Sequence, residues 1–460
     1  MIQLRERLRE LSILTLPLLV EHTFITLMGM VNTAMVASLG EEALSAAGHI
    51  NNASQIPVAL FAAMTTGGTI LVAQAVGARN AKKAGAAGGQ AVALAAVFSV
   101  ALSLLLTFTR NPTINWLFGD SDPAMVEAGF VYYMYIIWSL PFLAVAQTLF
   151  GVMRGAGDVK NPMKITLFMN IVNIVFSYVL IMGVSVPFNP INIPSFGMHG
   201  AGLAIAIARL VGMVYAIWII ISRKSPIRLN KLMWYKPTRG TQKDILTLGV
   251  PTGIEQLLFQ IGRLITQMMI IGMGTAVMAA NVVASNMMGF IMIPGNALTI
   301  SLMVMVGQRV GRRDIDDISK TTFFASVVAA VFMVLMSLIL LPMSGLIGVM
   351  FSLDAESTVY FRQLLTVLLI VGPFLWPLSF IIPSALRAVN DVKFTMVVSV
   401  STMWLFRIGF GYFLGITLGL GVAGVWLGIY GDWASRSILF YIRLRRKKWM
   451  KKLEMEGDAL

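Results

Sequence analysis

Long apolar runs separated by short polar stretches cover the chain from end to end. Runs of roughly 20 apolar residues are long enough to cross a bilayer as helices. The pattern predicts twelve spans, at residues 12–38, 49–76, 87–109, 128–153, 163–186, 200–222, 245–272, 280–306, 322–350, 359–386, 395–418 and 422–442. The predicted fold class is therefore an all-α membrane protein with twelve transmembrane helices.

Three short polar signatures occur twice, in the same order, among these apolar runs. Residues 17–21 (PLLVE) recur 234 positions later as residues 251–255 (PTGIE), and residues 72–80 (VAQAVGARN) recur at the same shift as residues 306–314 (VGQRVGRRD). Residues 154–160 (RGAGDVK) recur as residues 387–393 (RAVNDVK). Ordered recurrence at one spacing indicates a duplicated half. In an apolar chain, duplicated halves are typical of a transporter with its substrate site between them.

The duplication predicts the domain organisation. We expect an N-terminal six-helix lobe at 1–222, a cytoplasmic linker at 223–243, a C-terminal six-helix lobe at 244–443 and a basic cytoplasmic tail at 444–460. Six spans return the chain to its starting side, so the two lobes are predicted to be parallel repeats. They would be related by a pseudo-twofold axis along the membrane normal.

The charged residues are few and unevenly distributed. The chain has 460 residues, of which 57% are hydrophobic and 12% charged, and a formal net charge of +14. Most of the 35 Lys and Arg residues fall in alternate loops and at the two ends, which predicts that both termini face the cytoplasm of an inner-membrane protein. The basic excess therefore reflects topology, and we expect the lipid bilayer, not nucleic acid, as its partner.

Several kinds of chemistry lack the residues that they need. The chain has no Cys and three His, with no clustered carboxylates, which leaves a membrane-embedded enzyme without an evident metal or nucleophile site. It also has no Gly-rich phosphate loop followed by Lys-Ser or Lys-Thr. We therefore expect no cofactor, no fixed metal and no enzymatic activity.

Together the signatures resemble those of the multidrug and toxic compound extrusion (MATE) family, within the multidrug/oligosaccharidyl-lipid/polysaccharide exporter superfamily. The resemblance also runs through residues 29–36 (GMVNTAMV) and 170–173 (NIVN), so that it covers nearly the whole chain. It implies a cation-coupled antiporter built from two six-helix lobes. Lipid and polysaccharide flippases share this architecture and stay open as an alternative.

Ionisable groups within the spans are the first candidates for ion coupling, because each costs about 2.5–3.5 kcal/mol at a helix centre unless it faces a cavity or a partner. Glu255 is the strongest candidate, since a buried carboxylate can exchange a proton or offer oxygen ligands to a sodium ion. The resemblance implies the same role for the glutamate after this seventh-span proline. A structural ion pair, for example with Arg263, is the alternative.

Two further positions belong to the predicted coupling set. Glu21 is the equivalent acid in the first lobe, with a helix-packing hydrogen bond as the alternative. Asn32 stands where many relatives have a proton-binding aspartate, and an amide cannot exchange a proton near neutral pH. Coupling through position 32 is therefore in doubt, and this strengthens the assignment of Glu255 as the coupling residue. Asp432 and Arg436 are one helical turn apart and are predicted to form a structural pair.

The arginines of the signatures have a different predicted role. They lie at the predicted cytoplasmic ends of spans, next to Gly or Asp, at Arg79, Arg154, Arg313 and Arg387. We interpret them as capping residues that hold each lobe rigid, not as substrate ligands.

The predicted substrate cavity is lined by thioethers and amides. The 31 Met and 26 Phe residues favour flat, apolar, often cationic molecules. The expected lining residues are Met28, Met35, Asn170, Asn173, Ser177, Gln256, Gln260, Asn281 and Asn286. We thus predict a monomeric, proton- or sodium-coupled antiporter that exports amphipathic small-molecule cations by alternating access.

Overall fold

The computed structural model describes residues 2–119, 121–185, 192–222, 224–227, 229, 235–315, 317–447 and 449–450. Some predicted features lie outside the described residues. One is the middle of the segment between the sixth and seventh helices, which contains Pro187 and Pro190. The others are parts of the linker, among them residues 230–234, and residues 451–460 of the tail.

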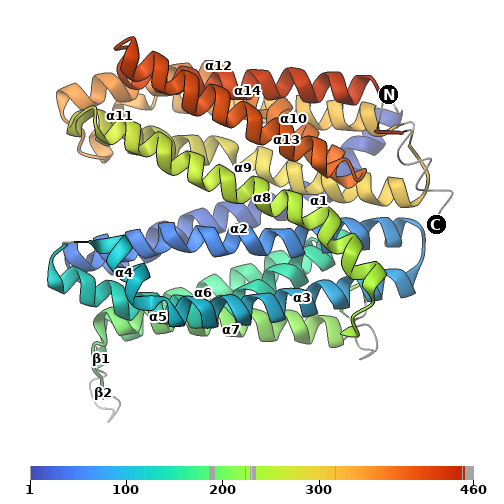
Figure 1. Cartoon of the computed structure of the whole chain (residues 1–460), viewed down its shortest axis with the longest axis horizontal. Helices are drawn as coiled ribbons and strands as arrows, with labels where there is room; N and C mark the ends of the chain where they lie inside the picture. The colour runs from blue at the N-terminus through green and yellow to red at the C-terminus, as the bar shows by residue number, and fades with distance from the viewer. Residues whose placement is uncertain are drawn as a thin grey trace. The chain divides into compact units, whose positions relative to one another are not determined.

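The described residues of the first half form six long helices and one short one (Figure 1). The long helices are α1 (Ile2–Ala37), α2 (Glu41–Gly77), α3 (Ala81–Phe108), α5 (Pro123–Gly155), α6 (Lys160–Met182) and α7 (Gly197–Ile221), and the short helix is α4 (Arg110–Phe118). Between α6 and α7, strands β1 (Val184–Ser185) and β2 (Asn192–Ile193) form an antiparallel pair in which Val184 lies opposite Ile193. This small hairpin was not predicted.

The second half repeats the arrangement. Its helices are α8 (Arg239–Ile271), α9 (Thr275–Gly311), α10 (Ile318–Leu340), short α11 (Ser344–Met350), α12 (Ala355–Ala388), α13 (Val392–Thr402) and α14 (Gly421–Arg445). Helix α13 continues into two π-helical segments, η2 (Met403–Phe410) and η3 (Phe413–Thr417). Asp354 begins α12 by accepting a 2.7 Å hydrogen bond from the backbone N–H of Ser357, and its hydrogen bonds with Ser357 hold the pKa of its carboxyl below the usual value.

Ten of the described helices are long and apolar enough to cross a membrane, counting α13 with its π-helical continuation as one. Helices α8 and α14 are not among the ten, because charged residues such as Glu255, Arg263, Asp432 and Arg436 lower their hydropathy. The predicted ninth span, 322–350, was too long, since α10 ends at Leu340 and α11 follows as a separate helix.

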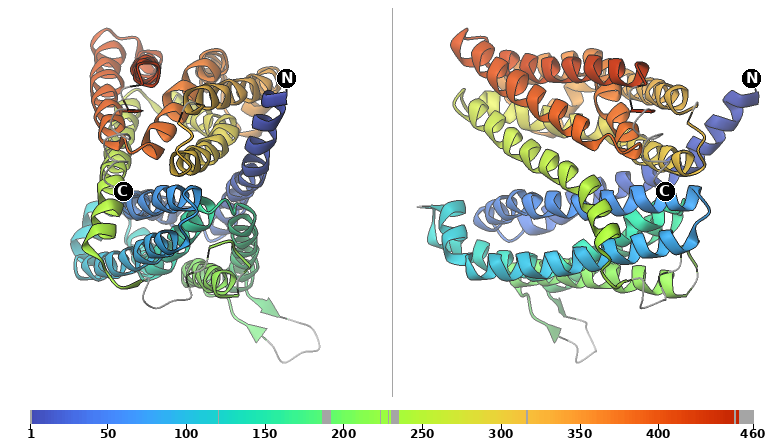
Figure 2. Two further views of the ribbon diagram at one scale, coloured as in Figure 1. Left: turned by 90° about the vertical axis from the view of Figure 1, so that its right-hand side faces the viewer. Right: turned by 45° about the vertical axis from the view of Figure 1, so that its right-hand side comes forward.

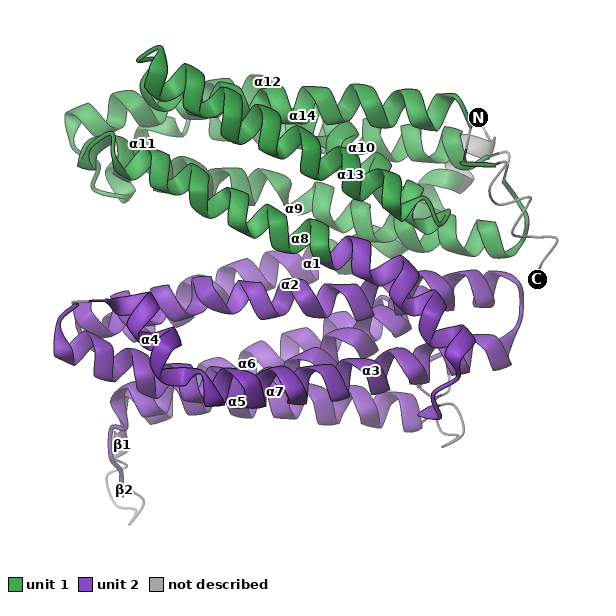
Figure 3. Ribbon diagram, viewed as in Figure 1, with its two compact units in different colours: residues 1–19, 254–460 green, residues 20–253 purple. Residues whose placement is uncertain are grey.

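The chain forms two compact units, shown in different colours in Figure 3. Unit 1 comprises residues 1–19 and 254–460, and unit 2 comprises residues 20–253. Both boundaries fall inside a long helix, between Leu19 and Val20 in α1 and between Gly253 and Ile254 in α8. Each boundary lies within a recurring Pro-x-x-x-Glu signature. The lobe limits predicted around a linker at 223–243 stay a prediction.

Unit 2 is built around α5, which contacts α2, α3 and α7. Two glycines one turn apart, Gly151 and Gly155, bring α5 close to α2. A Cβ atom at Gly155 would lie 2.6 Å from the carbonyl oxygen of Thr69, too close for any side chain. Small residues at this spacing allow close helix packing within membranes. The end of α5 that this close contact holds against α2 carries Arg154.

Unit 1 is built in the same way around α12, which contacts α9, α10 and α14. The turned views of Figure 2 show these helices lying lengthwise beside one another. Phe361, Leu365 and Trp376 of α12 are buried in the core of this unit. The end of α12 carries Arg387, the repeat partner of Arg154.

The signature turns end four helices in the same way. Arg79 and Arg313 adopt left-handed backbone conformations with φ of 55° and 62°, and Gly157 and Asn390 do so at the ends of α5 and α12. At Arg79 the backbone N–H donates to the carbonyl of Val76, and the next N–H, of Asn80, donates to that of Ala75. This paired bonding pattern is the Schellman motif. The interpretation of Arg79 and Arg313 as helix-end residues is confirmed.

Candidate functional site

In unit 2, the acid of one signature pairs with the arginine of another. Glu21 lies in the middle of α1, and Arg154 lies in the last turn of α5. Arg154 Nη2 donates to Glu21 Oε1 at 2.6 Å, and Thr166 Oγ1 of α6 donates to the same oxygen at 3.0 Å. Both side chains of the ion pair are largely buried. Three helices of this unit therefore meet at one carboxylate.

Unit 1 contains the equivalent pair. Arg387 Nη2 of α12 donates to Glu255 Oε1 of α8 at 2.7 Å, with the two side chains 13% and 8% exposed. The paired residues are 133 positions apart in one unit and 132 in the other. In both units an arginine Nη2 donates to a glutamate Oε1. The duplicated signatures thus form a duplicated, buried ion pair.

Each pair leaves matching atoms unsatisfied. Glu21 Oε2 and Arg154 Nε are buried without a hydrogen-bond partner, and so are Glu255 Oε2 and Arg387 Nε. Buried polar atoms normally have partners, so four such atoms in repeat-related places require an explanation. A carboxylate oxygen accepts a proton, a water hydrogen bond or a hard cation such as sodium. Each site therefore has a free oxygen suited to a small ion.

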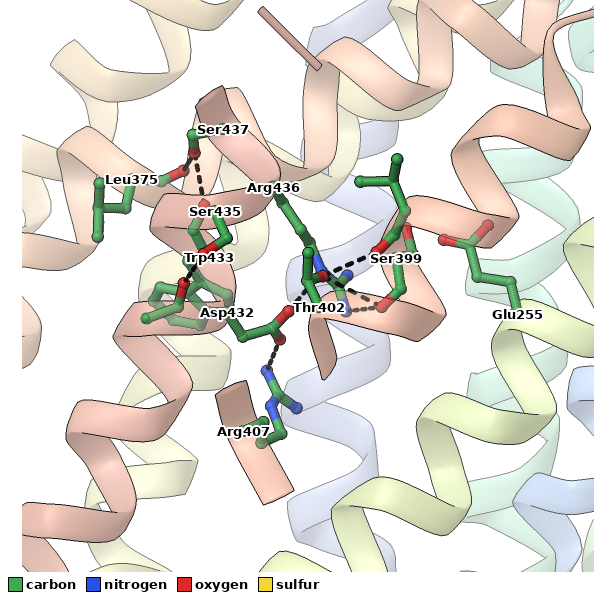
Figure 4. Close-up of polar contacts among 12 residues, drawn as sticks. Glu255, Leu375, Ser399, Thr402, Arg407, Asp432, Trp433, Ser435, Arg436 and Ser437 are labelled. Atoms are coloured by element: carbon green, nitrogen blue, oxygen red, sulfur yellow. Dashed lines mark hydrogen bonds and ion pairs between the residues drawn. The ribbon is translucent and has the colours of Figure 1, made fainter. Parts of the chain in front are cut away.

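The two sites differ in their neighbours. His22 follows Glu21, whereas Gln256 follows Glu255, and His22 Nε2 is also buried without a partner. At the position equivalent to Thr166, unit 1 has Ser399, whose Oγ is buried and unpartnered. The Glu255 carboxylate points toward Ser399 (Figure 4). Among the described residues, the first-half site therefore has a neighbouring imidazole where the second-half site has an amide.

Two interpretations of the arginines are corrected by this geometry. Arg154 and Arg387 do more than cap helices, because each holds a buried carboxylate. The partner of Glu255 is Arg387, not Arg263. The sequence pattern contained a signal for these partners, since both arginines belong to signatures that recur at nearly the same shift as the acids. It contained none for Thr166 or Ser399, whose neighbours in the sequence are unremarkable.

Asp432 lies in a separate charged cluster of unit 1 (Figure 4). It is fully buried on α14, where its Oδ1 accepts from Arg436 Nε at 2.7 Å and its Oδ2 lies 3.3 Å from Arg407 Nη2. Arg436 also donates to Thr402 Oγ1 at 3.1 Å and to the carbonyl of Ser399 at 2.8 Å. The structure therefore brings Asp432 and Arg436 together and adds Arg407, for which no role was predicted.

The amide candidates of the first half gather on α1 and α6. Ser177 Oγ donates to Asn32 Oδ1 at 3.3 Å, and Asn170 Nδ2 donates to the carbonyl of Thr166 at 2.8 Å. Asn173 Nδ2 is buried without a partner. Asn170, Asn173 and Ser177 lie on the same helix, α6, as Thr166, whose hydroxyl contacts Glu21.

The remaining cavity candidates are spread over several helices. Met35 is half-buried against the core of unit 2, and Met28 is half-buried on the same helix. Gln256 and Gln260 are half-buried on α8. On α9, Asn281 accepts a 3.0 Å hydrogen bond from Trp426 Nε1, and Asn286 is exposed. Their contact with substrate stays a prediction.

Comparisons with known proteins agree with the duplication. The chain matches the family model MatE twice, over residues 17–179 and 251–413. It is 26% identical over 444 residues to "Uncharacterized transporter YisQ" of Bacillus subtilis, covering 95% of this chain and 94% of that protein. It is 24% identical over 452 residues to "Probable multidrug resistance protein NorM" of Thermotoga maritima, covering 98% and 95%.

Solved structures give the fold. A structure described as "Crystal structure of MATE in the bent conformation" matches with a TM-score of 0.87 at 18% identity, covering 98% of this chain and 97% of that one. Another, described as "Outward-facing conformation of a multidrug resistance MATE family transporter of the MOP superfamily", matches with a TM-score of 0.84 at 20% identity, covering 97% and 96%. The protein has the all-helical MATE fold of a multi-pass membrane protein, and it belongs to the MATE family of transporters.

Proposed function

We propose that this protein is an ion-coupled antiporter that exports amphipathic, often cationic compounds in exchange for protons or sodium ions. The observation that carries the proposal is the duplicated buried pair, Glu21 with Arg154 and Glu255 with Arg387, in which each carboxylate keeps one oxygen free. The relatives described as multidrug resistance proteins support the class of cargo. Glu255 is the principal coupling residue of the proposal. Its carboxylate would take up a proton, or its free oxygen would bind a sodium ion.

The position of Glu255 links ion binding to a change of shape. Glu255 lies one turn after Pro251 in α8, and Arg387 lies one turn after Pro383 in α12. Proline removes a backbone hydrogen bond and bends a helix. A proton on Glu255 would remove the charge that holds Arg387, while a sodium ion would compete with it. Either event would loosen the contact between two helices that each contain a proline one turn before the pair.

The chain also passes from one compact unit to the other within each copy of the Pro-x-x-x-Glu signature. The boundary in α8 lies immediately before Ile254, and the boundary in α1 lies immediately before Val20, so Glu255 and Glu21 are each the second residue after it. An ion bound there would favour one access state only if it binds that state more tightly than the other. We place the coupling sites at these two acids for that reason.

The two halves have different parts in this scheme. Glu21, with His22 beside it, would form a second ion site in the first half. Asn32, with its 3.3 Å hydrogen bond from Ser177, would position cargo or water, because an amide holds no exchangeable proton near neutral pH. We further propose an inner-membrane protein, active as a monomer, with both termini in the cytoplasm.

The test is ethidium transport by the purified protein in proteoliposomes, driven by an imposed proton gradient or an imposed sodium gradient. We expect transport with one of the two gradients, and at least a tenfold loss in Glu255→Gln. Glu127→Gln, the same change at an exposed position of α5, is the matched control and should keep the wild-type rate. Undiminished transport by a well-folded Glu255→Gln protein would overturn the assignment of Glu255.

A further inference from the structure

The charged cluster in unit 1, defined as Asp432, Arg407 and Arg436, contains more positive than negative charge. Its side chains are 0%, 8% and 2% exposed. Arg263, on α8, is close enough to act electrostatically on Arg407, whereas the nearby Glu255 is already paired with Arg387. The buried guanidinium groups of Arg407 and Arg436 thus share a single carboxylate. Buried charge without a partner is strongly unfavourable, so an excess of this kind requires a compensating group.

Of the two buried arginines, Arg407 is the one whose positive charge is less well compensated. Arg436 is well satisfied, because it donates to Asp432, to Thr402 and to the carbonyl of Ser399. Arg407 instead contacts Asp432 only at 3.3 Å, without hydrogen-bond geometry on that oxygen, and its Nε is buried with no hydrogen-bond partner. A guanidinium carries five N–H donors in a planar fork that fits a carboxylate with two hydrogen bonds. Arg407 therefore offers the unused part of such a fork.

An aromatic ring lies against the same group. The Arg407 guanidinium lies 4.7 Å from the centre of the Phe259 ring, and that of Arg436 lies 5.5 Å from it. Arg263 is one helical turn beyond Phe259, so both project from the same face of α8. An anion bound at Arg407 would therefore have an aromatic surface beside it.

The backbone around the cluster is tightly held. Gly428 lies one turn before Asp432, and a Cβ atom there would lie 2.7 Å from the Cα atom of Gly411, which lies one turn after Arg407. Helix α14 thus packs directly on the helix that carries Arg407, in the π-helical segment η2. Segments of π-helix occur frequently at functional sites. The charged groups are preorganised by this contact, which is what a binding site needs.

We propose that Arg407 binds the negative group of a cargo molecule, a carboxylate carried by an aromatic amphiphile. The inference rests on the proposed export function for its cargo, and it extends the expected cargo from cations to zwitterions and monoanions. The carboxylate would use the free donors of Arg407 and balance its charge, and Phe259 would contact the aromatic part.

The test is equilibrium binding of anthracene-9-carboxylate and of its neutral amide to the full-length protein in lipid nanodiscs, with empty nanodiscs as the blank for lipid partition. A charged hydrogen bond predicts that wild type binds the acid at least about tenfold more tightly than the amide. Arg407→Gln should lower the affinity for the acid to that for the amide. Arg110→Gln, the same change at an exposed arginine of α4, should keep the preference.

Equal affinity of wild type for the acid and the amide would overturn the site, and this result does not depend on whether Arg407→Gln folds. An unchanged preference in a folded Arg407→Gln protein would also overturn it. The binding measurement uses no ion gradient, so it is separate from the transport test. Gradient-driven ethidium export together with equal acid and amide binding would reject only the anion site. Acid-selective binding without gradient-driven export would reject only the antiporter.

Discussion

Buried charged side chains are the residues on which the proposed function depends in this apolar chain. Glu21 and Glu255 are each held by one arginine, so the charge of each site is balanced, but one oxygen of each remains free. A buried ion pair contributes little net stability, because desolvation offsets the attraction between the charges. We therefore interpret both pairs as functional sites that the fold tolerates, not as its main source of stability.

This interpretation predicts a specific pattern of stability losses at the Glu255 pair. Arg387→Met should lower the free energy of unfolding by about 3–5 kcal/mol, because it leaves the Glu255 carboxylate buried without a counter-charge. The double variant Arg387→Met with Glu255→Gln should recover most of that loss, since no buried charge remains. Thermal unfolding of all four proteins in detergent measures the coupling. Additive losses would contradict a direct interaction between the two side chains.

The site could be predicted from the sequence only in part. Glu255 and Glu21 were identifiable because they are acids inside apolar runs. Their arginine partners lie more than 130 residues away, and no local pattern links them. The role of Arg407 depends on three helices that meet around it, and the sequence shows it only as an isolated base within a span.

At the scale of the elements, small residues determine where helices approach most closely. Gly151 and Gly155 bring α5 against α2, and Gly424 and Gly428 bring α14 against Gly411 and Gly415. Both contacts lie next to arginines of buried ion pairs. In lipid, where the hydrophobic effect between helices is weak, such close packing is a main source of helix association.

The contact at Gly428 gives a prediction with a matched control. Gly428→Ala should destabilise the protein by about 1–3 kcal/mol. The added methyl group would lie 2.7 Å from Gly411 Cα and would force α14 away from the helix that carries Gly411. Gly289→Ala in α9, where no atom lies within 4 Å of the added Cβ, should be neutral or slightly stabilising. Thermal midpoints in detergent compare the two. Equal midpoints would show that the α14 contact is not tight.

Most long helices were predictable because apolar runs specify them directly. The short helices α4 and α11 and the β1–β2 hairpin were not predicted, because each is too short to form a distinct apolar run of its own. The π-helical segments within 403–417 were also missed, since their residues are as apolar as those of an ordinary span.

At the scale of the whole molecule, the duplication is visible at three levels. The signatures recur 233 or 234 positions apart, the MatE model matches at residues 17–179 and again at 251–413, and the described residues of each unit contain a buried Glu–Arg pair. The fold and the family follow from these observations. The orientation in the membrane stays a prediction from charge, because basic residues concentrate in alternate loops.

The orientation can be tested because the chain has no Cys, so each introduced Cys is the only thiol. Glu42→Cys, at the exposed start of α2, should react with a membrane-impermeant maleimide added outside spheroplasts. Lys82→Cys, at the exposed start of α3, should react only after the membrane is permeabilised. The reverse labelling pattern would contradict cytoplasmic termini.

The most direct measurement of the central claim is the affinity for ethidium across a range of proton and sodium concentrations, with the protein in nanodiscs. An antiporter whose ion acts through Glu255 should bind ethidium more weakly as its coupling ion increases, and Glu255→Gln should bind ethidium with an affinity that depends on neither ion. Glu127→Gln should behave as wild type. The same ion dependence in a folded Glu255→Gln protein as in wild type would contradict the account.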